Sequence, residues 1–272
     1  MFTQGDFVPV TVIIPCFNSA ETVARSVQSV LSQTVLPKQL ILVDDASTDS
    51  GHTLAMLEAL KRKAVLSVPN VEVVSLKVNG GAANARNVAW KRADQPYLVF
   101  LDADDAWHPD KLKIQYGWMS QHPAAVLTGH GTSVISSDKL LYEPDKELFV
   151  VHVSRRDILL RNVFPTRTVM IKRDLPLRFD PHMRRAEDYH LWLRVVLMGY
   201  PAYRMRTTLA FSYKEDFGAG GLSAALWKME QAELGSYTKL TKLGLISWIE
   251  LPFLWCWSLM KYARRWILGI LV

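Results

Sequence analysis

Short apolar runs alternate with segments of helical periodicity through the first hundred residues of the chain. The runs are rich in Val, Ile and Leu and end at polar residues, as expected of strands buried on both faces of a sheet. Four of them predict strands, over residues 10–14, 40–43, 71–78 and 97–101. The segments between them carry apolar residues at helical spacing. This alternation predicts an α/β fold with a mostly parallel sheet flanked by helices.

Polar residues follow the predicted strands directly. Pro15 ends the first strand, and Asn18 is expected to cap the next helix, with Glu21 completing a capping box. Asp44 and Asp45 follow the second strand, where they suit either a ligand contact or a helix-capping turn. Open parallel sheets bind ligands at the carboxyl ends of their strands. We therefore expect a ligand site at this edge of the sheet.

The pattern changes in the second part of the chain. Pro109 is expected in the first turn of a helix that reaches Gln121, and Glu187 is expected to begin a helix that ends before Gly199. Apolar runs predict the remaining elements, namely strands over 125–129 and 168–172 and a long helix over 222–243.

Residues 243–272 are mostly apolar, but Glu250 and Pro252 interrupt them. A membrane-spanning helix needs about 20 apolar residues with few charges, so we expect one or two helices that lie in the membrane interface instead. The residues suited to headgroup depth and to anionic lipid are Trp248, Trp255, Trp257, Trp266, Lys261, Arg264 and Arg265. The alternative is a helix packed against the domain or in an oligomer contact.

Composition narrows the class of protein. The chain has 272 residues, 49% of them hydrophobic, which suffices for one large domain or for a domain with an appendage. Its net charge of +6 suits phosphorylated ligands or anionic lipid, and no nucleic-acid-binding signature is present. Cys16 and Cys256 lie in dissimilar contexts, so we expect no disulfide and a reducing cytoplasm. We also expect no secretory signal in residues 1–6.

Three carboxylates within four positions, Asp102, Asp104 and Asp105, follow the fourth predicted strand. They repel one another unless water or a cation relieves them. Mg²⁺ or Mn²⁺ suits oxygen ligands, and takes only one or two protein carboxylates when it also holds a substrate phosphate. We therefore predict a divalent ion with a phosphorylated ligand here, while a solvated acidic turn is the alternative.

Together these motifs resemble family 2 glycosyltransferases, which are inverting, nucleotide-sugar-dependent enzymes of the Rossmann-like GT-A fold. The shared segments are TVIIPCFN at 11–18, VDDASTD at 43–49, RN at 86–87, DAD at 102–104 and ED at 187–188. The likeness spans residues 8–215. It implies a GT-A domain over 1–221, with a nucleotide-binding half over 8–105 and an acceptor half over 106–221. A helical extension over 222–272 would follow, with 243–272 associating with the membrane.

The resemblance assigns the donor side of the site. Pro15, Phe17, Asn18 and Glu21 match the family segment that lies along the nucleotide base and ribose, although Glu21 also suits the capping box. Asp44 and Asp45 match the carboxylate contact to the base, usually uracil, whose imide N–H a carboxylate accepts. Arg86 matches the family's arginine near the nucleotide, where a guanidinium bridges phosphate or ribose oxygens. A surface arginine on a helix is the alternative.

The resemblance also assigns the metal and the base. Asp102 and Asp104 match the D-x-D motif, with Asp104 as the ligand of Mn²⁺ or Mg²⁺ and Asp102 contacting ribose or metal-bound water. Asp188 matches the family's general base, and Glu187 would orient the acceptor or the loop. Two acids in the first turn also complement a helix dipole, which is the alternative. Asp105 would support the metal site or cap the next helix.

Two further features concern the C-terminal part. Lys214, with Gly218, Gly220 and Gly221, would form a mobile loop whose cation stabilises the diphosphate. Processive family members carry Gln-x-x-Arg-Trp, but Tyr262 stands in place of Gln before Arg265 and Trp266. We therefore predict the transfer of a single sugar.

The resulting hypothesis is a metal-dependent glycosyltransferase at the cytoplasmic face of the inner membrane. It would move one sugar from a nucleotide diphosphate donor, with UDP as the expected nucleotide, to a glycan or lipid-linked glycan, with the oligomeric state left open. Two alternatives remain. A nucleotidyltransferase would carry a Gly-rich basic loop after the first strand, which residues 16–20 lack. A membrane-bound nucleotide-sugar sensor without turnover would not depend on Asp188.

Overall fold

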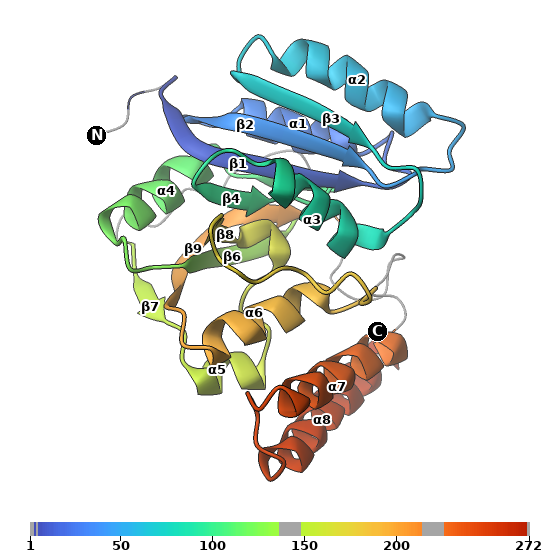
Figure 1. Ribbon diagram of the computed structural model, residues 1–272, viewed down its shortest axis with the longest axis vertical. Helices are drawn as coiled ribbons and strands as arrows, with labels where there is room; N and C mark the ends of the chain where they lie inside the picture. The colour runs from blue at the N-terminus through green and yellow to red at the C-terminus, as the bar shows by residue number, and fades with distance from the viewer. Residues whose placement is uncertain (1–2, 4, 136–147, 214–225, 271–272) are drawn as a thin grey trace.

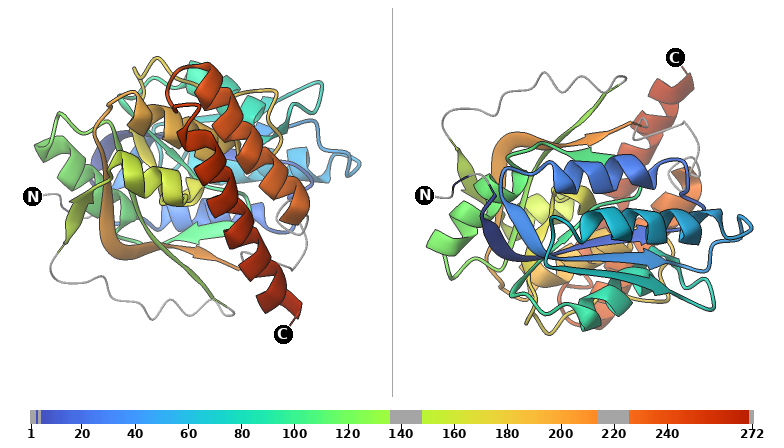
Figure 2. Two further views of the ribbon diagram at one scale, coloured as in Figure 1. Left: turned by 90° about the horizontal axis from the view of Figure 1, so that it is seen from below. Right: turned by 90° about the horizontal axis from the view of Figure 1, so that it is seen from above.

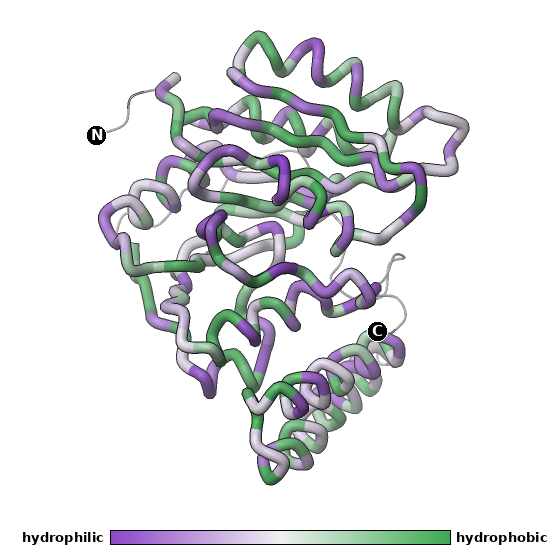
Figure 3. Tube along the Cα trace, viewed as in Figure 1, coloured by the Kyte–Doolittle hydropathy of each residue, from purple (hydrophilic) through white to green (hydrophobic). Residues whose placement is uncertain are grey.

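A nine-stranded sheet with helices on both faces forms the body of the molecule (Figure 1). The structure is a computed structural model, and it describes residues 3, 5–135, 148–213 and 226–270. The strand order is β3-β2-β1-β4-β8-β6-β9-β5, with β7 paired to β9. Hydrophobic residues concentrate along the central strands, as Figure 3 shows. The predicted α/β class is therefore confirmed.

The first half follows the predicted alternation of strands and helices. Its strands are β1 (Phe7–Cys16), β2 (Leu36–Asp44), β3 (Asn70–Ser75) and β4 (Tyr97–Phe100). Its helices are α1 (Val23–Leu31), α2 (His52–Ala64) and α3 (Gly81–Arg92). The four strands pair in parallel, and α1 and α2 share one hydrophobic core while α3 contributes to a second. The two cores lie on opposite faces of the sheet, as the alternation of side chains along a strand requires.

The second half departs from the predicted parallel sheet. Its strands are β5 (Asp105–Trp107), β6 (Leu127–Val134), β7 (Val150–His152), β8 (Met170–Lys172) and β9 (Ala202–Ser212). Among the described residues, these strands form four antiparallel pairings, β4–β8, β6–β8, β5–β9 and β7–β9, and one parallel pairing, β6–β9. The expectation of a mostly parallel sheet is thus wrong beyond β4. Short strands joined by loops do not need the helical crossover that parallel neighbours require.

The helices of the second half are α4 (Lys111–Gln121), α5 (Arg155–Leu160), the short 3₁₀ helix η1 (Thr166–Thr168), α6 (Glu187–Leu197), α7 (Leu226–Lys242) and α8 (Glu250–Ile270). Helix α6 begins at the predicted Glu187 and ends before Gly199, whose φ is +84°. Pro109 lies just outside α4, since Asp110 is the N-cap residue.

The start of α1 differs from the predicted capping box. The helix begins at Val23 after Thr22, and Asn18 adopts a left-handed conformation with a φ of +49°. The Asn18 side chain instead accepts a hydrogen bond of 2.8 Å from the backbone N–H of Thr48. Asn18 therefore ties the loop after β1 to the loop after β2, and Glu21 stands outside the helix rather than in its first turn.

Helices α7 and α8 form a hairpin below the sheet (Figures 1 and 2). Their buried residues Tyr237, Leu240 and Leu254 belong to the same hydrophobic core as α3 and α6. Pro252 lies in the first turn of α8, where a missing N–H costs nothing, so it does not break the helix. Within the described residues, no helix is both long and apolar enough to cross a membrane.

The basic residues of α8 divide between two surroundings. Lys261 pairs with Glu233 of α7 at 2.6 Å, and Arg265 pairs with the buried Glu230 at 3.0 Å. These two cations thus neutralise acids of the hairpin. Arg264 is exposed. The tail residues Trp248 and Trp266 are also exposed, at 65% and 54%.

Candidate active site

A cavity of about 840 Å³ lies at the carboxyl ends of β1, β2 and β4. Seven of the predicted site residues line it: Pro15, Phe17, Asn18, Glu21, Asp45, Asp102 and Asp104. Cys16 and His52 line it as well, although neither was predicted as a site residue. The strand ends bring together residues that are about 90 positions apart in the chain, as the parallel topology requires.

The acids after β2 hold loops in place. Asp44 accepts a hydrogen bond from the backbone N–H of Ser47 at 3.2 Å and does not line the cavity. Asp45 accepts from the N–H groups of Gly80 and Gly81 at 2.9 and 2.7 Å, and so caps the start of α3. Asp45 nevertheless borders the cavity, so its capping role and its predicted contact to the base are compatible.

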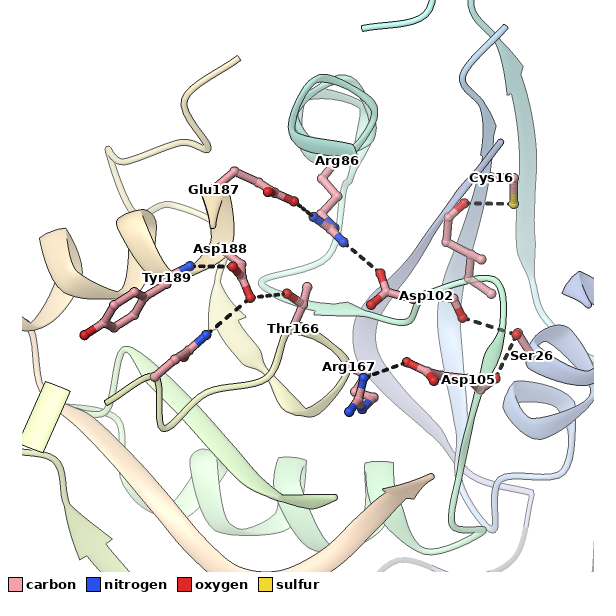
Figure 4. A network of polar contacts seen from close by, with 12 residues as sticks. Cys16, Ser26, Arg86, Asp102, Asp105, Thr166, Arg167, Glu187, Asp188 and Tyr189 are labelled. Carbon is pink, nitrogen blue, oxygen red and sulfur yellow. Dashed lines mark hydrogen bonds and ion pairs between the residues drawn. The ribbon is translucent and has the colours of Figure 1, made fainter. Parts of the chain in front are cut away.

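Arg86 is the centre of the polar network drawn in Figure 4. It projects from α3, is only 4% exposed, and donates to Asp102 at 2.7 Å and to Glu187 at 2.9 Å. Burial alone would lower the pKa of Arg86, but the carboxylates of Asp102 and Glu187 outweigh it and raise the pKa. The surface-arginine alternative is therefore wrong, and Arg86 links the cavity to the start of α6.

Glu187 and Asp188 occupy different environments at the start of α6. Glu187 is buried, which raises its pKa, although the charge of Arg86 opposes this shift. Asp188 is partly exposed and accepts hydrogen bonds from Thr166 at 2.9 Å and from Asn162 at 3.5 Å. The preceding Ala186 has a φ of +52°, a conformation that is costly for a residue with a side chain. Glu187 thus holds Arg86, whereas Asp188 faces the loop between α5 and η1 (Figure 4).

Thr166 and Asn162, which orient Asp188, were not predicted as site residues. They occur in the segment before β8, which carries no recognisable motif, and only the folded chain places them beside α6. No pattern of residue types in the sequence could have indicated them.

Asp105 differs from the other two acids of its cluster. It lies in β5, is 2% exposed, and pairs with Arg167 at 3.2 Å. Burial raises its pKa to about 7, against the opposing effect of Arg167. It does not cap α4, whose N-cap residue is Asp110. Asp105 is therefore a buried partner of Arg167 and does not line the cavity.

The remaining acids are compatible with a divalent ion. No three His, Cys, Asp or Glu side chains of the described ranges converge on one point as a preformed metal site. Asp102 and Asp104 nonetheless present oxygen atoms at the edge of a cavity large enough for a nucleotide diphosphate. An ion that receives its other oxygens from substrate phosphate and water needs no third protein ligand. The predicted residues Lys214, Gly218, Gly220 and Gly221 lie outside the described part of the chain.

Comparison with known proteins identifies the family of the chain. The model of the family "Glycosyl transferase family 2" matches residues 11–184 of the chain. The chain therefore belongs to glycosyl transferase family 2 and is a glycosyltransferase. The matched span includes the cavity residues, Arg86 and the D-x-D acids, but it ends before Glu187 and Asp188.

Individual proteins agree with this assignment. The chain is 30% identical over 262 residues to the putative teichuronic acid biosynthesis glycosyltransferase TuaG of Bacillus subtilis (strain 168), covering 94% of this chain and 95% of TuaG. It is 28% identical over 187 residues to the Escherichia coli UDP-Glc:alpha-D-GlcNAc-diphosphoundecaprenol beta-1,3-glucosyltransferase WfgD, covering 69% of each. Its fold resembles the mannosyltransferase PcManGT from Pyrobaculum calidifontis, solved with GDP-Man and Mn²⁺, with a TM-score of 0.64 and 19% identity over 99% of this chain and 80% of that one.

Proposed function

We propose that this protein is a metal-dependent inverting glycosyltransferase that moves a single sugar from a nucleotide diphosphate donor to a hydroxyl of a glycan or lipid-linked glycan. One observation carries the proposal. Arg86 bonds Asp102 at the cavity and Glu187 beside Asp188 at the same time. One network of ion pairs therefore links the donor cavity to the candidate base, and such a link would hold the donor sugar and the base in a fixed relative position.

The donor is held on the wall of the cavity. Phe17 is 46% exposed and offers an apolar surface to the base, while Asp45 offers a carboxylate. A carboxylate accepts the imide N–H of uracil, which favours a UDP-linked sugar. WfgD, whose name specifies UDP-Glc, supports this choice. Asp44 is the weaker candidate for the base contact because it does not line the cavity.

Asp104 and Asp102 would hold Mn²⁺ or Mg²⁺ together with the donor's diphosphate. When bound, the ion offsets the negative charge that develops on the departing diphosphate. Arg86 orients the Asp102 carboxylate, because its buried guanidinium donates a hydrogen bond to that carboxylate at 2.7 Å. Lys214 remains a predicted contact to the diphosphate.

Asp188 would act as the general base. Thr166 and Asn162 hold its Oδ2 atom from one side, and the acceptor hydroxyl would approach the remaining lone pairs. Asp188 takes the hydroxyl proton while the oxygen attacks the anomeric carbon opposite the diphosphate, so that the configuration inverts. Glu187 would not take this proton, because it is buried against Arg86.

The relatives indicate the acceptor, and the C-terminal hairpin indicates the location. WfgD acts on a diphosphoundecaprenol-linked sugar by its name, and TuaG is named for teichuronic acid biosynthesis, so we propose a lipid-linked glycan acceptor. The exposed aromatic residues of α8 would lie in the headgroup region of an anionic membrane, on its cytoplasmic face. Tyr262 in place of glutamine supports single-sugar transfer over processive synthesis.

The decisive experiment compares Asp188→Asn with wild type. We expect turnover of the nucleotide sugar to fall at least about a hundredfold, while the affinity for UDP with Mn²⁺ stays within about twofold. Asp174→Asn, at an exposed aspartate outside the cavity, is the matched control and should keep full turnover. Full turnover in Asp188→Asn would eliminate the mechanism.

The same assay separates the two alternative functions. A nucleotide-sugar sensor would bind UDP and show no transfer in any variant. A nucleotidyltransferase would form a nucleotide sugar from a nucleoside triphosphate and a sugar phosphate. The loop over 16–20 lies along the cavity wall without a glycine or a cation, which disfavours that reaction.

A further inference from the structure

A second hollow, which we name the basic groove, lies between α5 and α8 and has a volume of about 610 Å³. Its walls combine four cations with an apolar strip: Arg156, Arg161, Lys261, Arg264, Trp257 and Met260. It is separate from the donor cavity and shares no lining residue with it.

Hydrogen bonds hold the two walls of the basic groove in place. The Trp257 indole donates to the carbonyl of Leu160 at 2.8 Å, which joins α8 to the end of α5. Arg155 donates to the carbonyl of Leu245 at 2.8 Å and to Glu250 at 2.8 Å, which fixes the start of α8. The groove is thus a built feature rather than a gap between loosely packed helices.

The positive charge of the basic groove is mostly unneutralised. Lys261 is paired with Glu233, but across the described residues Arg156, Arg161 and Arg264 have no carboxylate within ion-pair distance. Among the described lining residues, the acid is Asp157, which accepts hydrogen bonds from Ser154 in the capping box of α5. The hydrogen bonds from Ser154 and the nearby charges of Arg161 and Arg156 lower the pKa of Asp157, so it offsets part of the positive charge of the groove. Three exposed guanidinium groups without an ion pair exceed the single acid Asp157 of the lining, so they are suited to an anionic ligand, and phosphate oxygens match their geometry.

A neighbouring arginine adds to this excess of positive charge. The pKa of Arg204 on β9 is lowered by its burial and also by the positive charges of Arg161 and Arg206. Like charges therefore crowd around Arg161. A bound anion would relieve this repulsion.

The basic groove adjoins the acceptor side of the candidate active site. Arg161 directly precedes Asn162, whose amide contacts Asp188 at 3.5 Å. Helix α8 runs from the lower end of the molecule toward the side where the arrows of β1, β2 and β3 end (Figure 1). Exposed apolar residues continue along α8 beyond the groove, among them Phe253 at 73% and Trp266 at 54%.

We infer that the basic groove binds the diphosphate of a lipid-linked acceptor, with Trp257 and Met260 contacting the first carbons of its lipid chain. This inference rests on the proposed function. The acceptor hydroxyl at Asp188 and the anomeric diphosphate would belong to one sugar ring, and Arg161 directly precedes the Asn162 that contacts Asp188. Phosphate next to hydrocarbon is also the chemistry that guanidinium groups beside an indole recognise.

Farnesyl diphosphate, a soluble lipid diphosphate, is a suitable probe. We expect the double variant Arg161→Gln/Arg264→Gln to bind it at least about tenfold more weakly than wild type, since each charge-assisted contact contributes about that factor. The control Arg62→Gln changes an exposed arginine on α2, at the opposite end of the molecule, and should bind like wild type (Figure 1). Unchanged affinity in the double variant would overturn the inference.

Two further measurements identify the source of the phosphate. Inorganic pyrophosphate should bind more weakly than farnesyl diphosphate, and equal affinity would exclude the lipid contact with Trp257 and Met260. Vesicles of phosphatidylcholine with phosphatidylglycerol should bind the double variant nearly as well as wild type. A loss for these vesicles as large as that for farnesyl diphosphate would assign the groove to bulk anionic lipid and overturn the inference.

The outcome can be separated from that of the proposed function. Asp188→Asn should keep the affinity for farnesyl diphosphate, and the double variant should keep the affinity for UDP with Mn²⁺. With a lipid-linked acceptor, the double variant should show a raised KM for the acceptor and an unchanged KM for the donor. If the double variant binds farnesyl diphosphate like wild type, the proposed role of Asp188 is unaffected. If Asp188→Asn keeps full turnover, the binding measurements on the basic groove remain valid.

Discussion

Arg86 joins the two sides of the site through a buried guanidinium between two carboxylates. Removing one member of such a network leaves uncompensated buried charge. We expect Arg86→Gln to lower the free energy of unfolding by about 3 kcal/mol, measured by urea denaturation at neutral pH. Arg92→Gln on the same helix breaks an exposed pair with Glu72 and should cost less than about 1 kcal/mol. Equal losses of unfolding free energy in the two variants would mean that the burial of Arg86 does not determine its contribution to stability.

His130 makes stability depend on pH. It is 1% exposed, and burial lowers its pKa to about 3, with the charge of Lys111 acting in the same direction. In the unfolded chain this histidine takes up a proton near pH 6.5, whereas in the folded chain it stays neutral down to about pH 3. The free energy of unfolding therefore decreases as the pH falls from about 6.5 toward 3.

Replacing this residue should flatten the pH dependence. We expect His130→Asn, which retains a donor for the Gly131 carbonyl, to reduce the slope of unfolding free energy by up to about 1.4 kcal/mol per pH unit between pH 6 and about 4. Denaturation at several pH values measures the slope. His182→Asn, at an exposed histidine, is the control. An unchanged slope in His130→Asn would show that this ring is protonated in the folded state.

At the scale of elements, α8 has one packed and one open side. Leu254 is 8% exposed and belongs to the core, whereas the adjacent Phe253 is 73% exposed. We expect Leu254→Ala to lower the free energy of unfolding by about 2–3 kcal/mol, because it leaves a cavity. Phe253→Ser should change stability by less than about 0.5 kcal/mol and should reduce sedimentation with anionic vesicles. Vesicle binding that stays unchanged in Phe253→Ser would contradict the interfacial role of α8.

The donor site belongs to the whole molecule, because its walls come from several strand ends and loops. A ligand that bridges them stabilises the fold by mass action, by about 2.7 kcal/mol at a hundred times its Kd. We expect UDP to raise the melting temperature with Mn²⁺ present and to have little effect after chelation with EDTA. Asp104→Asn should remove this dependence on Mn²⁺. An equal shift with and without the ion would exclude a metal-bridged diphosphate.

Local patterns suffice for the first half of the fold and for the positions of many site residues. Apolar runs determine β1, β2 and β4, and each polar motif directly follows a strand, so the common edge of a parallel sheet brings them together. The same reasoning failed for Asn18, which was predicted to cap a helix. A cap depends on the backbone conformation of a single residue, and the conformation of Asn18 accompanies a hydrogen bond from Thr48 in a distant loop.

Contacts between distant segments are decided only by the tertiary structure. The bridge from Asp102 through Arg86 to Glu187 spans about a hundred positions. The antiparallel pairings of β8 with β4 and of β9 with β5 depend on loops without a motif. The orientation of Asp188 by Thr166 and the basic groove between α5 and α8 have the same origin. Residue types and periodicity determine what each segment is, because those depend on near neighbours. Which side chains meet depends on how the segments pack, because packing is settled by the whole core at once.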